Sequence, residues 1–309
     1  MAISASMVKE LRELTGAGMM DCKKALTETD GDLDAAVELL RKSGAAKAEK
    51  KASRIAAEGL CRAITEDNKT AAVVEVNSET DFVAKNEKFQ NYVDEVANQA
   101  LASDAADMAA FMEEECLADS GKTVNEKLVE MVATIGEKLS IRRFEKLSAD
   151  CVVTYVHGGG RIGVIVAAET DVVNDSIKEA MTNIAMQVAA LNPKYVSDEE
   201  VSAEYIAHEK EILKAQIMND PKESQKPEKV IEGMIAGRVK KELKEICLND
   251  QIYVKATDGK QSVAQYVAQV AKENAAAFKI TKFVRFETGE GMEKKNEDFA
   301  AEVAAQMGN

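Results

Sequence analysis

The stretch AVVEVNSETDFVAKNEKF, residues 72–89, largely decides the fold, because a strand-like apolar run leads through a polar loop into a helix. The motif at its centre, SETD at 78–81, occurs again as AETD at 168–171. A helix with matching apolar positions follows both copies, and the loop of the first copy is two residues longer, at 82–86. Repeated strand, loop and helix units predict an α+β fold with two related subdomains. The matching positions are Phe89, Val93, Val96 and Ala100 in the first copy and Ile177, Met181, Ile184 and Val188 in the second.

Strand and helix signals alternate on both sides of this repeated motif. Residues 60–64 and 72–76 predict a hairpin that turns at Asp67-Asn68, and the run from His157 to Gly160 predicts a second hairpin turn. Further strands are predicted at 141–147, 152–156, 162–168 and 280–287, and helices at 87–102, 105–117, 123–137 and 297–306.

The first fifty residues contain three short amphipathic helices with stop signals between them. The run 15–18 breaks the first helix, Asp32 caps the third, and Ser43-Gly44 ends it, so residues 1–45 predict a compact three-helix module. Residues 46–58 are rich in Ala and Lys and predict a solvated, basic helical linker, although the same basic face would also suit an acidic partner surface.

A helical segment interrupts the second subdomain. Residues 198–246 contain two stretches with apolar stripes around a polar turn that includes Pro221 and Pro227, which predicts an antiparallel hairpin projecting from the body. The predicted division is a core N-subdomain at 59–140, a core C-subdomain in two parts at 141–197 and 247–290, the hairpin inserted between those parts, and a helical module at 291–309.

The composition excludes several classes of protein. The net charge of -14 argues against general nucleic-acid binding, because that affinity rests on Lys and Arg at phosphates. The five cysteines form no CxxC pair and have no His at ligand spacing, so reduced thiols and no metal site are predicted. No run of 18 apolar residues and no signal-peptide core occur, which predicts a soluble cytoplasmic protein. Two histidines supply few general bases, which disfavours an enzyme.

The loop TDFVAKN, residues 80–86, is the sharpest candidate for a binding site. Phe82 lies between Asp81 and Lys85, where neither helix nor strand packing is available to hold an aromatic ring. Two interpretations stay open from the residues alone. Phe82 folds back into its own core, as most aromatic side chains do, or it anchors a partner while Asp81 supplies a charge beside it.

Two other segments are weaker candidates. Met19 and Met20 open a helix in a small module, where they serve either as core filler or as an adaptable contact surface. The run at 15–18 lacks the preceding strand and the lysine spacing of a phosphate loop, so no nucleotide site is expected there. His157 lies in a glycine-rich turn without a recognisable nucleophile, which favours a contact with a partner or solvent over catalysis.

Five stretches of the chain resemble the elongation factor Ts family, the exchange factors of bacterial translation elongation. Any single stretch is weak evidence for the family, but all five occur in family order from one end of the chain to the other. They are VKELRELTGAGMMDCKKAL (8–26), NSETDFVAKNEKF (77–89), IGEKLSIRRFEKL (135–147), YVHGGGRIGVIV (155–166) and FVRFETGEGMEKKNEDFAAEVA (283–304).

The resemblance implies a partner and a mechanism that the residues alone do not supply. It implies a guanine-nucleotide exchange factor that is not an enzyme, needs no cofactor, and binds the GTPase elongation factor Tu with GDP. It also implies a ubiquitin-associated-like fold for residues 1–45. The TDFV segment is implied to disturb the partner's magnesium site by inserting its aromatic ring between partner helices, which favours the second interpretation of Phe82. The residues concerned are Thr80, Asp81, Phe82 and Val83.

Secondary contacts are implied in the same way. Arg12, Met19, Met20 and Lys23 match the surface that docks beside the partner's nucleotide domain, and His157 matches the turn histidine that faces the partner's other domains. No direct contact with nucleic acid or membrane is expected. The segment 198–246 differs in detail from better-known members, so a homodimer or a two-to-two complex stays open.

Three rival hypotheses explain less of the sequence. A peptide-binding adaptor built on the N-terminal helices leaves TDFVAKN and the later FVRFETGEGMEK without a purpose. An enzyme that uses His157 with a carboxylate predicts a perturbed histidine in an enclosed pocket. A ribosome-bound RNA-binding protein conflicts with the net charge of -14.

Overall fold

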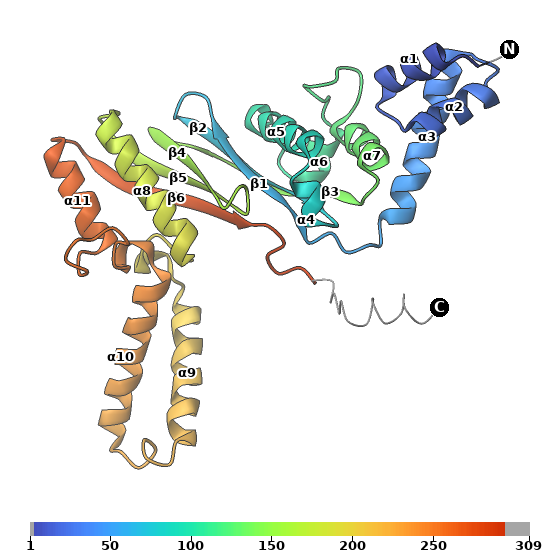
Figure 1. Ribbon diagram of the computed structural model, residues 1–309. Helices are drawn as coiled ribbons and strands as arrows, with labels where there is room; N and C mark the ends of the chain where they lie inside the picture. The colour runs from blue at the N-terminus through green and yellow to red at the C-terminus, as the bar shows by residue number, and fades with distance from the viewer. Residues whose placement is uncertain (1–2, 294–309) are drawn as a thin grey trace.

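A computed structural model of the chain describes residues 3–293. Within that range, helices combine with two small antiparallel sheets, so the predicted α+β class is confirmed (Figure 1). The predicted helix at 297–306, and all of the predicted module at 291–309 except its first three residues, lie outside the described residues.

The first three helices form a small module with its own apolar core. They are α1 (Ala5–Thr15), α2 (Met19–Glu28) and α3 (Leu33–Lys51). Ser4 caps α1 and Asp32 caps α3 through their side chains, and Gly16, with φ at 65°, ends α1 in the left-handed conformation. The core of the module consists of Val8, Leu11, Cys22, Ala25, Leu26 and Ala36.

The predicted end of the third helix at Ser43-Gly44 is wrong. Helix α3 continues to Lys51 and takes in part of the segment whose composition predicted a solvated linker. Gly44 is buried against Ala133 of the later helix α7 (Val124–Ile135), where a Cβ on the glycine would lie 3.5 Å from the Ala133 Cβ. Close packing of small residues therefore outweighs the low helix propensity of glycine at this position.

Two three-stranded antiparallel sheets form the body of the molecule. Their strand orders are β1-β2-β3 and β4-β5-β6. The register shifts opposite Glu75 and Val76 in the first sheet and opposite Ala167 and Ala168 in the second, so each sheet has a bulge in an edge strand, with Arg142 of β3 and Thr281 of β6 as the extra residues. The strands are β1 (Glu58–Thr65), β2 (Thr70–Ser78), β3 (Leu139–Ser148), β4 (Cys151–His157), β5 (Ile162–Thr170) and β6 (Phe278–Glu287).

The two sheets pack face to face, and helices cover the outer face of each (Figure 1). Alternate residues point to opposite sides of a strand, so Val73 and Ile165 fill the layer between the sheets while Val74 and Val164 face the helices. The helices over the first sheet are α5 (Glu87–Ala102), α6 (Met108–Glu113) and α7, and those over the second are α8 (Asp175–Leu191) and α11 (Val263–Glu273).

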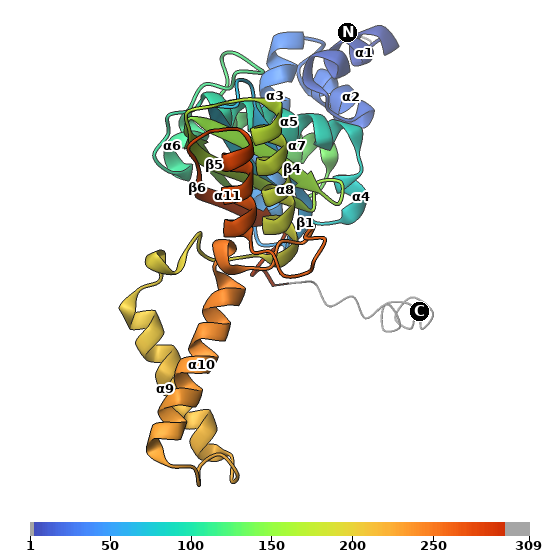
Figure 2. The same ribbon diagram turned by 90° about the vertical axis from the view of Figure 1, so that its left-hand side faces the viewer.

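Two long helices, joined by a short connection, project away from the sheets in both views (Figures 1 and 2). They are α9 (Ala203–Asn219) and α10 (Glu228–Ile246), the arms of a helical hairpin. The arms share a separate apolar cluster in which Ile217 is fully buried. Short 3-10 helices at Asp198–Glu200 and Leu248–Asp250 flank the hairpin.

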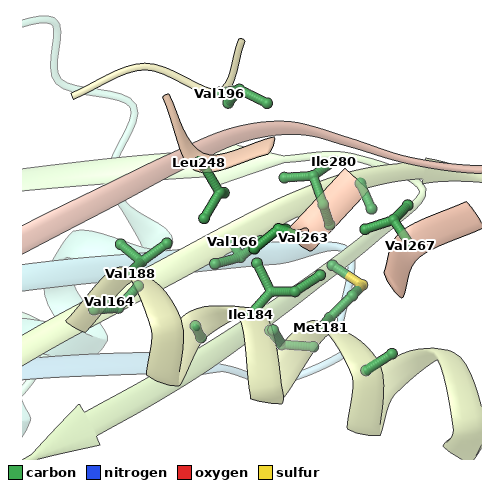
Figure 3. Close-up of a cluster of buried hydrophobic side chains, with 14 of the residues drawn as sticks. Val164, Val166, Met181, Ile184, Val188, Val196, Leu248, Val263, Val267 and Ile280 are labelled. Atoms are coloured by element: carbon green, nitrogen blue, oxygen red, sulfur yellow. The ribbon is translucent and has the colours of Figure 1, made fainter. Parts of the chain in front are cut away.

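The core of the second subdomain joins segments on both sides of the hairpin (Figure 3). Val166 of β5 lies among Met181 and Ile184 of α8, and Val263 of α11 completes the cluster together with Leu248, which follows the hairpin. The hairpin is thus an insertion, because the chain returns to the same core after it.

The two halves also repeat at the level of single hydrogen bonds. Gln99 of α5 and Gln187 of α8 are both buried, and each side-chain amide bonds the backbone of a segment that leads into the next helix. The bonded groups are Glu115 O and Leu117 N in the first half, and Ile252 O and Val254 N in the second. Helices α7 and α11 then begin with capping boxes at Thr123 and Ser262, so the repeat extends beyond the matching sequence.

Helix bounds follow capping groups more closely than apolar patterns. The predicted helix 87–102 coincides with α5, which Asn86 caps. The predicted helix 105–117 is shorter, because Asp107 caps α6 and Glu114 leaves the helix to accept hydrogen bonds from Gln99 and Ser103. In the described range of the chain, no helix combines the length and apolarity needed to cross a membrane.

Candidate functional site

The loop between β2 and α5 contains a single helical turn, α4 (Asp81–Ala84). Thr80 caps this turn from an extended backbone, and its Oγ1 accepts a hydrogen bond from Val83 N at 3.4 Å. Val83 points inward and joins the core cluster that contains Phe89 and Val93 of α5. The cap at Thr80 therefore holds the start of the turn, and the buried side chain of Val83 holds its middle.

Phe82 points away from that core. Its side chain is 79% exposed, the highest value among the large apolar residues of the described range. Because Val83 takes the inward position on the turn, its neighbour Phe82 faces outward. The interpretation in which Phe82 folds back into the core is therefore wrong, and an exposed ring on a fastened turn has the features of an anchor for a partner's pocket.

Charged side chains flank the exposed ring. Lys85 Nζ lies 2.7 Å from Asp81 Oδ2 and 5.9 Å from the centroid of the Phe82 ring. The hydrogen bond from Lys85 lowers the pKa of the Asp81 carboxyl, so Asp81 is charged at neutral pH. Because both groups are exposed, the pair adds little to the stability of the fold, but it places one charge of each sign beside the ring.

A further contact to the turn comes from Glu137, in the connection between α7 and β3. Its carboxylate accepts hydrogen bonds from the backbone of Glu79 and Thr80 and from the Thr80 hydroxyl. No local sequence pattern marks Glu137 as a functional residue, because these bonds join segments that are far apart in the chain. Its place in IGEKLSIRRFEKL, one of the stretches that carry the family resemblance, is the one signal available beforehand.

The predicted contact residues of the N-terminal module all lie on its surface. Met19 and Met20 open α2 and are 56% and 76% exposed, so their interpretation as core filler is wrong. Cys22, the next residue but one, fills the core instead. Arg12 of α1 and Lys23 of α2 are exposed as well, so one small module presents two apolar and two basic side chains.

His157 ends β4 at an exposed hairpin turn. Its Nδ1 lies 2.9 Å from Tyr155 Oη, and the following Gly158 and Gly159 have φ values of 61° and 66°, the left-handed region that glycine adopts without strain. An exposed turn is not the enclosed pocket that the enzyme hypothesis predicted. The predicted contact residues thus lie on three separate parts of the fold: α4 with its cap, the N-terminal module, and the β4–β5 turn.

The cysteines are buried inside the modules. All five are free, and burial raises the pKa of Cys61 to about 12 and that of Cys247 to about 11. These two thiols are therefore protonated and unreactive at neutral pH. Among residues 3–293, no three His, Cys, Asp or Glu side chains cluster in the way that would hold a metal ion.

Proteins of similar sequence identify the family. The family described as Elongation factor TS matches residues 79–290, a range that includes α4, Glu137 and His157. The elongation factor Ts of Clostridioides difficile (strain 630) is 52% identical over 307 residues, and that of Clostridium novyi (strain NT) is 50% identical over 308 residues. Each match covers 99% of this chain and 99% of the relative. Sequence similarity over the full length therefore agrees with the motifs and the exposed Phe82 turn: the chain belongs to the elongation factor Ts family.

Proposed function

We propose that this chain is the guanine-nucleotide exchange factor of elongation factor Tu: in the cytoplasm it binds the GDP-bound GTPase and promotes GDP release, so that GTP loads during translation elongation. Membership of the elongation factor Ts family supports a role in nucleotide exchange. The observation that carries the proposal is Phe82, which is 79% exposed on a capped turn where a partner's pocket can receive it. The chain changes no covalent bond in this role, so it is not an enzyme.

Exchange follows from differential binding. A factor that binds nucleotide-free elongation factor Tu more tightly than the GDP-bound form must weaken GDP binding by the same ratio, because the two equilibria are linked. Contacts that are equally strong with the GDP-bound and the nucleotide-free partner stabilise the complex but do not weaken GDP binding. The active residues are therefore those whose contacts improve as GDP leaves.

We assign that differential contact to Phe82. Its ring enters between the helices of the partner that support the bound Mg²⁺. Loss of this cation leaves the charge of the diphosphate less compensated, and the affinity for GDP falls. Thr80 and Val83 hold the turn in the chain itself, and Asp81 brings a negative charge to the same place.

The remaining contacts dock the factor on its partner. Arg12, Met19, Met20 and Lys23 lie beside the nucleotide domain of elongation factor Tu, and His157 faces its other domains. The exposure of all five side chains supports this assignment. Separate docking surfaces fix the orientation in which Phe82 approaches the magnesium site.

Met20→Asp is expected to weaken binding to GDP-bound elongation factor Tu by about tenfold or more, because a charged carboxylate replaces an apolar thioether in the docking surface. Titration calorimetry measures the loss. Leu117→Asp is the matched control, because Leu117 is 64% exposed in a loop outside the proposed docking surfaces, and it should bind as the wild type does. Wild-type affinity in Met20→Asp would remove the N-terminal module from the interface.

We further propose how the parts of the chain divide the work. Residues 1–45 form a ubiquitin-associated-like docking domain joined through 46–58 to the core. The N-subdomain at 59–140 carries Phe82, and the C-subdomain at 141–197 and 247–290 carries His157. The hairpin at 198–246 and the module at 291–309 complete the chain, and none of these parts binds nucleic acid or membrane. A homodimer of the factor would give a two-to-two complex, which the mass of the complex in solution distinguishes from one-to-one.

Two affinities test the proposal. Elongation factor Tu is prepared with GDP and free of nucleotide, and binding of the chain to each form is measured by titration. The nucleotide-free form is expected to bind about 100-fold more tightly, the upper range of typical coupling between two sites. Equal affinities for the two forms would reject nucleotide exchange even if a stable complex forms.

A further inference from the structure

The turn that carries Phe82 rests on a carboxylate from another part of the chain. Glu137 Oε2 accepts hydrogen bonds from Glu79 N and Thr80 N, both at 3.1 Å, and Glu137 Oε1 accepts one from Thr80 Oγ1 at 2.8 Å. Three donors therefore meet a single carboxylate immediately before α4. Hydrogen bonds to a charged acceptor are stronger than those between neutral groups.

The contact is reciprocal. Glu79 Oε1 accepts a hydrogen bond from Lys138 N at 2.6 Å, while Glu137 accepts from the backbone of Glu79. Gly136, with φ at 88°, ends α7 and turns the chain so that Glu137 and Lys138 face β2. Arg54, which follows α3, pairs with Glu79 at 3.2 Å and accepts from Lys138 Nζ through its carbonyl at 2.8 Å. Two connections far apart in the sequence thus hold each other in place.

The Thr80 hydroxyl is the point through which Glu137 reaches α4. That hydroxyl donates its proton to Glu137 and accepts from Val83 N, so Glu137 sets the direction of the lone pair that caps the turn. A single helical turn is not stable without such support, because helix nucleation costs more than one hydrogen bond returns. Phe82 lies between Thr80, whose side chain caps the turn, and Val83, whose backbone N–H donates to that cap.

We propose that Glu137 is a positioning residue for nucleotide exchange: through Thr80 it keeps α4 formed and Phe82 directed outward before the partner is met. This inference rests on the proposed role of Phe82. A turn that is formed for only a fraction of the time in the docked complex would lower the GDP release rate at saturating factor by about that fraction. Glu137 does not touch the partner in this role, so its loss changes how well Phe82 acts, and docking stays intact.

Glu137→Ala tests the proposal in the full chain. The GDP release rate from elongation factor Tu at saturating factor is expected to fall roughly tenfold, with the half-saturating concentration within about twofold of the wild type. Glu137→Gln is expected to retain most of the activity, because its amide oxygen still accepts from the two backbone N–H groups and its amide N–H can donate to Thr80 Oγ1, which keeps Thr80 tied to residue 137 while a second lone pair of Oγ1 caps the turn. In a Phe82→Ala background, Glu137→Ala should cause no further loss, because Glu137 acts only through Phe82.

Two measurements separate positioning from a general loss of stability. Asp107→Ala removes the cap of α6, a comparable local defect in another loop of the same subdomain, and should leave release at the wild-type rate. Amide hydrogen exchange of Glu79 and Thr80 should quicken in Glu137→Ala while the amides of α5 stay protected.

The outcomes distinguish this inference from the function on which it rests. A wild-type chain that does not accelerate GDP release rejects the exchange function itself. An active wild type with an equally active Glu137→Ala, or an additive further loss in the Phe82→Ala background, rejects the positioning role of Glu137 alone.

Discussion

Phe82→Ala is expected to lose most of the proposed acceleration of GDP release while it still docks on elongation factor Tu. The side chain is 79% exposed, and the contacts that shape the turn come from Thr80, Val83 and Lys85, which the substitution leaves in place. An aromatic anchor at a partner's pocket is typically worth about 2 kcal/mol or more, which corresponds to a release rate at least about 30-fold lower. Release of fluorescent GDP at saturating factor measures the effect.

Phe82→Leu is the matched variant for this result. It keeps an apolar side chain but removes the ring, so its release rate is expected to fall between those of the wild type and the alanine variant. Both variants should unfold at the wild-type midpoint, because the side chain contributes little to the core. Release at the wild-type rate by a Phe82→Ala variant that binds normally would show that the ring does not disturb the magnesium site.

Glu75→Ala is expected to lower the free energy of unfolding by about 2–4 kcal/mol. Glu75 of β2 is fully buried, with Arg143 Nε 2.6 Å from Oε2, and with Arg142 Nη1 at 3.0 Å and Gly289 N at 2.8 Å from Oε1. The two arginines come from β3, and Gly289 follows β6, so one carboxylate joins the two sheets. Its removal leaves the Gly289 N–H without this acceptor and takes the buried carboxylate away from both arginines, of which Arg143 keeps an ion pair with Glu290 at 3.3 Å.

The expected loss of about 2–4 kcal/mol is smaller than the roughly 3–5 kcal/mol typical of a fully buried ion pair that loses one partner. The side chains of Arg142 and Arg143 are 27% and 30% exposed, so both partly rehydrate when the carboxylate is gone. Urea unfolding measures the change, and Glu145→Ala, at an exposed position of β3, should stay within about 0.5 kcal/mol of the wild type. An equally small change in Glu75→Ala would mean that the buried network contributes nothing net.

Capping residues and apolar patterns predicted most helices and strands. Where these local patterns did not decide the structure, contacts between distant segments did. The helix at 87–102 was predictable because Asn86 caps it and its apolar face is regular. The extension of α3 through Gly44 was not, because it depends on Ala133 of a later helix. Helix α11 was not predicted, because the sequence match between the two halves ends at α8 while their structures continue to correspond.

The candidate site shows the same division between local and tertiary information. TDFV could be identified as a candidate site from its sequence, but the exposure of Phe82 follows from the burial of its neighbour Val83 and from the cap at Thr80. The exposure of Met19 and Met20 likewise follows from Cys22 filling the core of the small module. Glu137 is recognisable only when the α7–β3 connection is placed beside β2, which no local pattern specifies.

The most direct test of the central claim is the release rate of fluorescent GDP from elongation factor Tu, with this protein added in steps under excess unlabelled nucleotide. If the chain is the exchange factor, the rate rises with its concentration to a plateau, and the plateau drops in Phe82→Ala. An unchanged release rate at every concentration, with elongation factor Tu shown to bind GDP and GTP normally, would contradict nucleotide exchange by this chain.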